Sequence, residues 1–189
     1  MELKKLKTKF IGHNIIYFKS ISSTQVFAKS TKNEDTPNGT VIIADSQTEG
    51  IGTHERKWYT GKNNIAMTFV LYPECNISKI SNLTVLIAEC IISAIKKLYG
   101  YELKIKEPND VIYNNKKIAG ILTESKVEGE IVKKIFIGVG LNVNQTIFPE
   151  NLKDIASSLK NEFFKEFSRE EIISEFFNIF EEEYLRLIK

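Results

Sequence analysis

The chain has 189 residues, of which 42% are hydrophobic and 26% are charged, and its formal net charge is +2. This composition predicts one globular domain over residues 1–189 with a sizeable core. The small net charge does not favour binding to nucleic acid, no apolar run is long enough to predict a membrane span, and the lysine-rich start lacks the pattern of a signal peptide.

The first seventy residues predict three short strands and one helix. Three apolar runs are typical of strands, at residues 15–18, 39–44 and 64–71. A helix is expected to start near residue 24, capped by the hydroxyl of Ser23 or Thr24. These hydroxyls act as caps alone, or they also contact a polar ligand at the start of the helix, and the sequence leaves both readings open.

A long polar loop, residues 47–58, separates the second and third of these strands. Gly50 and Gly52 allow backbone N–H groups in this loop to face an anionic ligand without obstruction by side chains. Arg56 adds a fixed positive charge, and Trp58, the only tryptophan of the chain, offers a flat face to an aromatic ring. A loop of this length is either functional or a mobile surface segment, and the loop alone favours neither.

The middle of the chain predicts an amphipathic helix followed by antiparallel hairpins. Apolar residues recur at helical spacing over residues 83–98, and Gly100 follows as a helix terminator. Cys90 lies in this apolar stripe, and because Cys90 and Cys75 form no CxxC pair, we expect a reduced, cytoplasmic protein without a zinc site or a disulfide. Four strands are expected next, at residues 102–106, 111–113, 116–124 and 131–143.

The last predicted element is a helix that begins at the capping box Ser168-Arg-Glu-Glu171 and has a wide apolar face. A run of hairpins flanked by helices differs from a βαβ series. The predicted class is therefore α+β, with a mixed, mostly antiparallel sheet and with helices on one side of it.

Polar residues and glycines interrupt the predicted hairpins. Pro108 interrupts the backbone hydrogen bonds of the strand, and Asn109 and Asp110 follow at this interruption. These two residues form either a functional site or a local turn. Lys117 comes next, on a hairpin where an exposed lysine is common. Further along, the paired glycines at 138 and 140 indicate close approach of a ligand or of another backbone.

Together these segments resemble the ordered motifs of the biotin protein ligases. The resemblance is carried by Gln47 with Gly50-x-Gly52-x-x-x-Arg56-x-Trp58, by Lys106-x-Pro-Asn-Asp110, by Lys117-Ile-Ala-Gly120-Ile-Leu-x-Glu124 and by Gly138-x-Gly-x-Asn142. Ser23-Thr24-Gln25 and Ala156-Ser157-Ser158-Leu159 match two further family elements. Each motif is weak by itself, but their order over residues 14–185 is specific, and it implies the fold that biotin ligases share with class II aminoacyl-tRNA synthetases.

The resemblance implies a two-step reaction with biotin and ATP as substrates and with Mg²⁺. The carboxylate of biotin attacks the α-phosphate of ATP to give biotinyl-5′-AMP and pyrophosphate. A lysine of a biotin carboxyl carrier protein then attacks the mixed anhydride. Family members often pair through sheet edges, so a homodimer is a further expectation, whereas a membrane partner is not expected.

The resemblance also implies roles for individual residues. Lys117, Arg56 and Asp110 would be catalytic, and Asp110 would in addition hold Mg²⁺. The residues implied in biotin binding are Ser23, Thr24, Gln25, Gln47, Gly50, Ile51, Gly52, Thr53, Lys117, Gly120 and Gly138. The residues implied in binding ATP and the adenylate are Arg56, Trp58, Asn109, Lys117, Gly140 and Asn142. Hydroxyl and amide groups suit the ureido ring, and cations suit charge that grows on the α-phosphate.

The chain departs from the family pattern in the loop, where the usual sequence is Gly-Arg-Gly-Arg-x-Gly-Arg-x-Trp. Ile51 and Thr53 stand in place of the two leading arginines, and Glu55 replaces the later glycine. Backbone contacts survive such changes, whereas contacts through charge do not. No segment before residue 14 or after Lys189 corresponds to the helix-turn-helix domain or the SH3-like C-terminal domain of longer members, so we expect neither domain and no DNA binding.

Two rival functions stay open. A lipoate–protein ligase of the same fold would have no use for the polar group of Ser23, Thr24 and Gln47, because lipoate lacks a ureido ring. A non-catalytic protein that binds biotin or an adenylate is kept open by the altered loop. Biotin-dependent exchange of pyrophosphate into ATP separates these functions.

Overall fold

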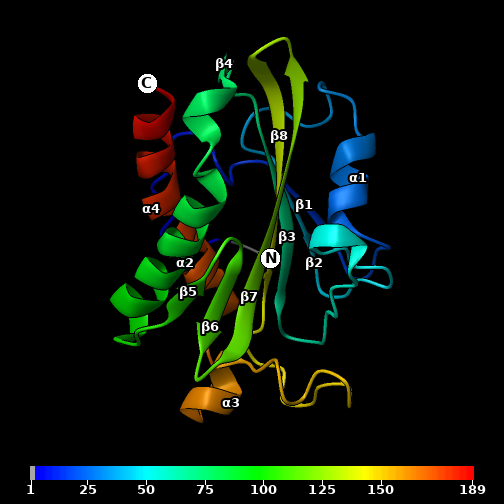
Figure 1. Cartoon of the computed structure of the whole chain (residues 1–189), viewed down its shortest axis with the longest axis vertical. Helices are drawn as coiled ribbons and strands as arrows, with labels where there is room; N and C mark the ends of the chain where they lie inside the picture. The colour runs from blue at the N-terminus through cyan, green and yellow to red at the C-terminus, as the bar shows by residue number, and fades with distance from the viewer. Residues whose placement is uncertain (1–2) are drawn as a thin grey trace.

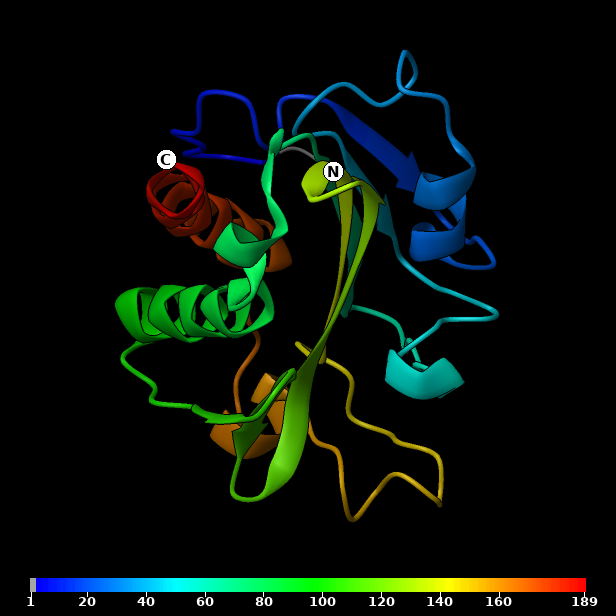
Figure 2. The same cartoon turned by 45° about the horizontal axis from the view of Figure 1, so that its top comes forward.

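A twisted sheet lies at the centre of the computed structural model, which describes residues 3–189 (Figures 1 and 2). Its strands are β1 (Ile15–Phe18), β2 (Val41–Ala44), β3 (Ile65–Leu71), β4 (Cys75–Asn76), β5 (Lys104–Lys106), β6 (Asp110–Tyr113), β7 (Lys116–Glu128) and β8 (Ile131–Leu141). The strand order is β1-β2-β3-β8-β7-β6-β5, with β4 also paired to β8. Among the described strands β1 and β2 are parallel and the other pairs are antiparallel, which confirms the predicted mixed sheet.

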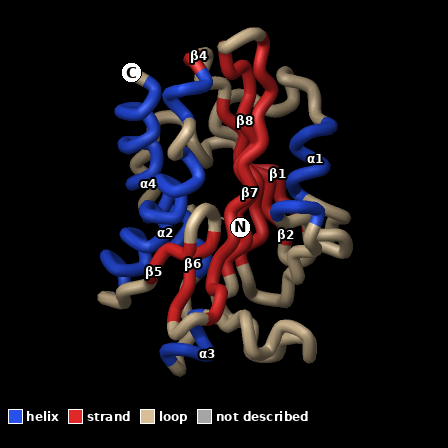
Figure 3. The backbone as a smooth tube through the Cα atoms, viewed as in Figure 1, coloured by secondary structure: helices blue, strands red, loops and turns tan. Residues whose placement is uncertain are grey.

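Helices cover both faces of this sheet. The helices are α1 (Thr24–Ser30), α2 (Leu83–Tyr99), α3 (Leu159–Phe163) and α4 (Arg169–Ile188), with short 3₁₀ turns η1 (Thr53–Glu55) and η2 (Ile77–Ile80). Figures 1 and 3 show α2 and α4 together on one face and α1 on the other. The α+β class is confirmed, but the prediction of helices on one side only is wrong for α1. Because every residue of β2 and β3 is buried, both faces of these strands need a cover.

An aromatic cluster joins the sheet to α4. The ring of Phe69 in β3 lies edge-on to three rings of α4, with centroids 6.0, 5.4 and 5.3 Å from Phe176, Phe177 and Phe180. The helix begins as predicted, since the Ser168 hydroxyl accepts a hydrogen bond from the backbone N–H of Glu171 at 3.2 Å. The main core therefore lies between the sheet and the α2–α4 layer, away from α1.

One helical segment, Ile77–Tyr99, is long and apolar enough by length and composition to cross a membrane. The expectation that no run reaches this length is therefore wrong. Within the segment, α2 ends as predicted at Gly100, whose φ is 78°. The residues of α2 that face the sheet and α4 are buried in the core, namely Leu83, Ile87, Ala88, Cys90, Ile91, Ala94 and Ile95. An apolar helix of a protein core passes the same test of length and composition.

The two cysteines are free and buried. Burial raises the pKa of the Cys90 thiol to about 12, helped by the negative charges of Glu183 and Glu89. Burial also raises the pKa of the Cys75 thiol. Both thiols are therefore protonated at neutral pH, and Cys90 packs as a small apolar group in the predicted stripe.

Replacing Phe69 by alanine should lower the free energy of unfolding by about 3–5 kcal/mol, because it removes a fully buried ring from three aromatic contacts. Urea denaturation followed by circular dichroism measures the change. Phe164→Ala is the matched control, since that ring is 92% exposed and its removal should change stability by less than about 0.5 kcal/mol. Equal effects from the two variants would contradict the assigned core.

Candidate active site

Two adjoining cavities open on the face of the sheet that carries α1. The first, of about 40 Å³, is lined mainly by the start of α1, the 47–58 loop, the residue before β6, β7 and β8. Its lining includes Ser23, Thr24, Gln25, Gln47, Ile51, Asn109, Gly120 and Gly138. The second, of about 360 Å³, includes Arg56, Asp110 and Asn142. Both cavities share the lining residues Gly52, Thr53, Trp58 and Lys117. The polar segments that interrupt the predicted strands therefore meet at one pair of cavities. Gln47 lines the first cavity, Asn142 lines the second, and Lys117 lines both.

The 47–58 loop folds into a small hairpin. The N–H of Gly52 donates to the carbonyl of Arg56 at 2.7 Å, and the N–H of Trp58 donates to the carbonyl of Gly50 at 2.8 Å. The Gly52 N–H is therefore already engaged, contrary to the expectation that it faces an anion. Gly50 lies behind the cavity wall, where an added Cβ would come within 2.4 Å of the Trp58 carbonyl oxygen.

Arg56 is exposed and turns back onto the loop, where its guanidinium donates to the Thr53 carbonyl at 3.2 Å and to the Thr53 hydroxyl at 2.9 Å. The Thr53 hydroxyl thus holds the arginine at the rim of the second cavity. The side chain of Glu55 lies outside the described residues. The nearby His54 is exposed and has a left-handed backbone, with φ 54°.

The indole of Trp58 covers the two glycines at the centre of the site. An added Cβ would lie 2.2 Å from the indole at Gly140 and 2.9 Å from it at Gly120. These glycines were expected to make room for a ligand, and in this structure they make room for the Trp58 ring. The ring lines both cavities, and the first has a volume of about 40 Å³, which is room for only a few water molecules. A larger ligand in the first cavity therefore requires the indole to move.

A cluster of hydroxyl and amide groups closes the inner end of the first cavity. The side-chain oxygen of Gln47 accepts from the N–H of Thr24 at 2.8 Å and from its hydroxyl at 3.1 Å. The Gln47 amide nitrogen donates to Thr60 at 3.1 Å, and the Ser23 hydroxyl oxygen caps α1 by accepting from the Val26 N–H at 3.4 Å. One Gln47 N–H, the Ser23 proton and a Thr24 lone pair are left for a ligand.

Gln25 lies behind this cluster and links it to a carboxylate. Its amide nitrogen donates to Glu124 at 2.8 Å, and its amide oxygen lies 3.0 Å from the Thr68 hydroxyl. Lys29 donates to the other oxygen of Glu124 at 2.7 Å. Burial raises the pKa of the Glu124 carboxyl, but the hydrogen bonds from Lys29 and Gln25 outweigh it and hold the pKa below its usual value. Glu124 is therefore ionised at neutral pH.

Lys117 forms an ion pair with Asp110 at the junction of the cavities. The distance between its ammonium and the carboxylate is 2.6 Å, and both side chains are more than two-thirds buried. The ammonium also lies 5.4 Å from the centre of the Trp58 ring. Asp110 belongs to β6 and Lys117 to β7, so the antiparallel pairing of these strands brings the two residues together.

The described residues do not fit a resident metal site. They contain no group of three or more His, Cys, Asp and Glu side chains that could hold a metal ion. Asp110, the residue expected to hold Mg²⁺, is paired with Lys117, and Asn109 donates to the Ile121 carbonyl at 3.2 Å. A protein site for Mg²⁺ normally supplies one or two free carboxylates together with oxygens from the substrate. In this structure the Asp110 carboxylate is engaged by Lys117, so a role for Asp110 in holding Mg²⁺ stays a prediction.

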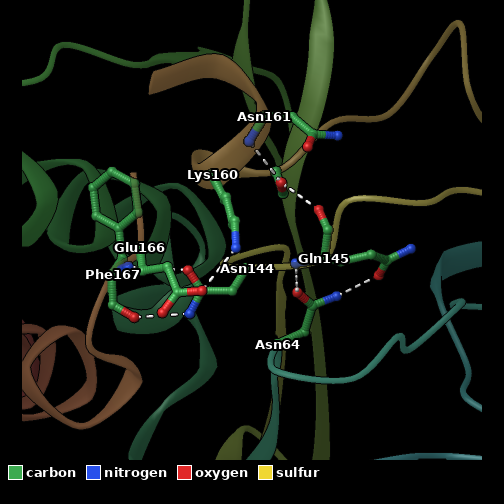
Figure 4. Close-up of polar contacts among 8 residues, drawn as sticks. Asn64, Asn144, Gln145, Lys160, Asn161, Glu166 and Phe167 are labelled. Carbon is green, nitrogen blue, oxygen red and sulfur yellow. Dashed lines mark hydrogen bonds and ion pairs between the residues drawn. The ribbon is translucent and has the colours of Figure 1, made fainter. Parts of the chain in front are cut away.

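A buried amide network fixes Asn142 at the edge of the second cavity. Asn64 donates to the side-chain oxygens of Asn142 at 3.3 Å and Gln145 at 2.6 Å, and accepts from the N–H groups of Val143 and Gln145 at 2.9 and 3.3 Å. Figure 4 shows Asn64 reaching Gln145 in this way. The network ties the start of β3 to the segment that follows β8.

Several lining residues were not identified from the sequence. Two residues that support the site without lining it, Thr68 and Asn64, were also missed, and they carry a detectable signal because they are polar residues in or beside an apolar, fully buried strand. The apolar wall of the second cavity comes from Ile112, Phe148, Leu152 and Ile155, which have no distinctive pattern, and from Ala156, which belongs to the Ala156-Ser157-Ser158-Leu159 element noted in the sequence.

Comparison with known proteins places this site in context. Residues 17–142 match the model of the biotin/lipoate A/B protein ligase family. The bifunctional ligase/repressor BirA of Bacillus subtilis is 38% identical over 182 residues, which cover 95% of this chain and 56% of that protein. Biotin–protein ligase 2 of Arabidopsis thaliana is 30% identical over 190 residues, which cover 95% of this chain and 55% of that protein. The chain therefore spans about half the length of these curated relatives.

A solved structure has the same fold. The biotin protein ligase from Aquifex aeolicus in complex with biotin and ATP superposes with a TM-score of 0.78 and 29% sequence identity, covering 92% of this chain and 71% of that one. This similarity confirms the fold class predicted from the sequence, which is the class II synthetase-like fold of the biotin ligases.

Replacing Gly140 by alanine should push the Trp58 indole out of its position, because the new methyl group would meet the ring at 2.2 Å. Since Trp58 is the only tryptophan, its fluorescence reports this change directly. We expect a red-shifted emission and stronger quenching by iodide, with an unchanged far-ultraviolet circular dichroism spectrum as the control for folding. Emission identical to that of the unmodified protein would contradict the contact.

Proposed function

This chain belongs to the biotin/lipoate A/B protein ligase family, and we propose that it activates biotin with ATP and transfers the biotin to a lysine of a biotin carboxyl carrier protein. The observation that carries the proposal is the pair of cavities that meet at Lys117. An acyl-adenylate has an acyl part and a nucleotide part. The first cavity is small and has polar groups at its inner end, which suits the ureido ring of biotin, and the second is larger and has an apolar wall, which suits the nucleotide. The names of the relatives and the biotin and ATP bound in the Aquifex aeolicus enzyme support the same assignment.

Biotin would enter the first cavity with its ureido ring towards the polar cluster. The ring has two N–H donors and one carbonyl acceptor, and burying any of these groups without a hydrogen-bond partner costs free energy. The free Gln47 N–H and the Ser23 hydroxyl suit the carbonyl, and the Thr24 oxygen suits an N–H. Small residues of the sheet, including Gly138, leave space for the bicyclic ring. The valeryl chain then runs towards Lys117.

The nucleotide would occupy the second cavity, which is the larger and has an apolar wall. Asn142 presents an amide at its edge, and Trp58, once displaced from the glycines, offers a ring face for the adenine. Arg56 stands at the rim, next to Thr53. We assign Mg²⁺ to the triphosphate of the incoming nucleotide rather than to a protein site.

The first step places new negative charge beside Lys117. A biotin carboxylate oxygen bonds to the α-phosphorus, and the bond from that phosphorus to the β-phosphate oxygen breaks with its electron pair, which releases pyrophosphate. The Lys117 ammonium stabilises this charge, and its ion pair with Asp110 orients the ammonium. In the second step the neutral amine of the carrier lysine attacks the carbonyl carbon, AMP leaves, and the amine loses a proton as the amide forms.

The polar cluster favours biotin over lipoate as the substrate. A dithiolane ring makes no hydrogen bonds, so Gln47, Thr24 and Ser23 would lose contact with water without gaining a partner. A site built to hydrogen-bond its substrate strongly rejects an analogue that lacks those groups.

The experiment that tests the proposed function is exchange of labelled pyrophosphate into ATP. We expect exchange that depends on biotin and is at least about 100-fold slower with lipoate, because the ureido contacts are absent. Exchange with lipoate alone would identify a lipoate ligase. Biotin binding in calorimetry without exchange would identify a binding protein that does not catalyse activation.

Replacing Lys117 by alanine should slow biotin-dependent exchange by about two to three orders of magnitude, because one preorganised charge is lost from the developing transition state. Lys116→Ala is the matched control, since Lys116 is the preceding residue of β7 and lines neither described cavity. Circular dichroism should show both variants folded. Normal exchange by Lys117→Ala would remove this lysine from the mechanism.

A further inference from the structure

A buried asparagine that lines neither cavity holds the side chain of Asn142 at the edge of the second one. Asn64 directly precedes β3 and is 2% exposed, and its amide nitrogen lies 3.3 Å from the side-chain oxygen of Asn142. Asn142 lines the second cavity, whereas Asn64 lines neither described cavity. Any effect of Asn64 on a ligand there therefore passes through the residues that it binds.

Backbone groups fix the orientation of the Asn64 amide. One end of this amide accepts from the backbone N–H of Val143 at 2.9 Å and from that of Gln145 at 3.3 Å. A backbone N–H only donates, so the oxygen has to face these two groups and the NH₂ group has to face the other way. The two protons of the NH₂ group are directed at the side-chain oxygens of Gln145, at 2.6 Å, and of Asn142 (Figure 4 shows the contacts with Gln145).

The donor from Asn64 in turn fixes which end of the Asn142 amide faces the cavity. The oxygen of Asn142 turns towards Asn64, so its NH₂ group turns towards Lys117, whose backbone carbonyl lies 3.5 Å from that nitrogen. Lys117 lines both cavities. The contact with the carbonyl is long and uses one proton at most, so the second N–H of Asn142 has no partner among the described residues. Asn142 therefore presents a hydrogen-bond donor on the cavity side.

We propose that Asn64 is a positioning residue for the nucleotide, which turns the Asn142 amide so that an N–H donor meets an acceptor nitrogen of the adenine ring. The inference deepens the proposed function and rests on it. The ring nitrogens N1, N3 and N7 of adenine accept hydrogen bonds and carry no proton, so an N–H suits them, whereas an amide oxygen in its place would repel them. Asn64 sets affinity for the base and takes no part in the chemical step.

Asn64→Asp tests the proposal with little change of shape. The new carboxyl keeps one oxygen for the two backbone N–H groups, but its other oxygen carries one proton at most. Gln145 would take that proton, because its oxygen is closer than that of Asn142 and its amide is held at both ends by backbone groups. The Asn142 amide then reverses to donate to the carboxyl, which turns its oxygen towards the cavity.

Analogues of ATP in which N1, N3 or N7 of the adenine is replaced by C–H report the donor. With the unmodified chain, we expect one of these analogues to have a KM in biotin-dependent pyrophosphate exchange about tenfold above that of ATP, the typical value of one hydrogen bond. In Asn64→Asp the KM for ATP should rise about tenfold, and the KM for that analogue should not exceed it by more than about twofold. A variant that only loosened the fold would raise every KM and keep their ratio. The Kd for biotin, measured by calorimetry, should change by less than about twofold.

A double variant tests the route through Asn142. Asn142→Ala has no amide to reverse, so adding Asn64→Asp to it should change the KM for ATP by less than about twofold. Asn144→Asp is the matched control, because Asn144 also bridges two backbone groups, those of Phe167 at 3.0 and 2.8 Å, and lines neither described cavity (Figure 4). This control should lower the thermal midpoint and keep the tenfold difference between ATP and the analogue.

Asn64→Ala serves if the carboxyl at position 64 prevents folding. It removes the donor to Asn142 without adding a charge, so the Asn142 amide can adopt either orientation. The difference in KM between ATP and the analogue should then fall below about threefold.

The outcomes separate the two claims. If the unmodified chain shows no biotin-dependent exchange, the proposed function fails and this inference fails with it. If the unmodified chain catalyses exchange but uses all the analogues as well as ATP, or if a folded Asn64 variant keeps the tenfold difference, only the inference fails. An undiminished effect of Asn64→Asp in the Asn142→Ala background would also overturn the inference, because Asn64 would then act by another route.

Discussion

The register between β7 and β8 is the constraint on which the site depends. It sets Gly120 opposite Gly140 and Leu122 opposite Gly138. Side chains alternate between the faces of a strand, so a slip of one residue would turn these positions towards the α2–α4 layer and remove the floor of the first cavity. Pairing of β7 with β6 then brings Lys117 to Asp110. The burial of the apolar residues of both strands specifies this register, and the catalytic geometry follows from it.

The sequence predicted most of the elements because their patterns are local. Alternating or continuous apolar runs, the Ser168 cap and the Gly100 terminator indicate strands and helices without knowledge of the tertiary structure. The position of α1 was not predictable in the same way, because a seven-residue helix with few apolar residues does not reveal which face it covers. Most of the expected site residues line the two cavities, but only the resemblance to a family supplied that grouping, since polar residues that interrupt separate hairpins carry no information about one another.

The contacts made by those residues were harder to predict than their positions. Asp110 was expected to hold Mg²⁺, and the structure gives it a lysine partner from the neighbouring strand. Gly120 and Gly140 were expected to face a ligand, and they face an indole from a loop more than sixty residues earlier in the chain. Such pairings depend on which side chain fills a space, and a single sequence without coordinates does not specify that choice.

The altered loop also has a physical interpretation. With Ile51 and Thr53 in place of arginines, the loop is held by backbone hydrogen bonds and Thr53 holds Arg56, so the remaining arginine is positioned by the loop itself. The same hairpin keeps Trp58 over the glycines, where the indole fills the space between the two cavities. A substrate that displaces the ring therefore has to break the Trp58 packing before it gains the contacts of the polar cluster. In the proposed reaction, binding would thus be coupled to movement of the loop, and a loop that closes again over the adenylate would exclude water from the mixed anhydride.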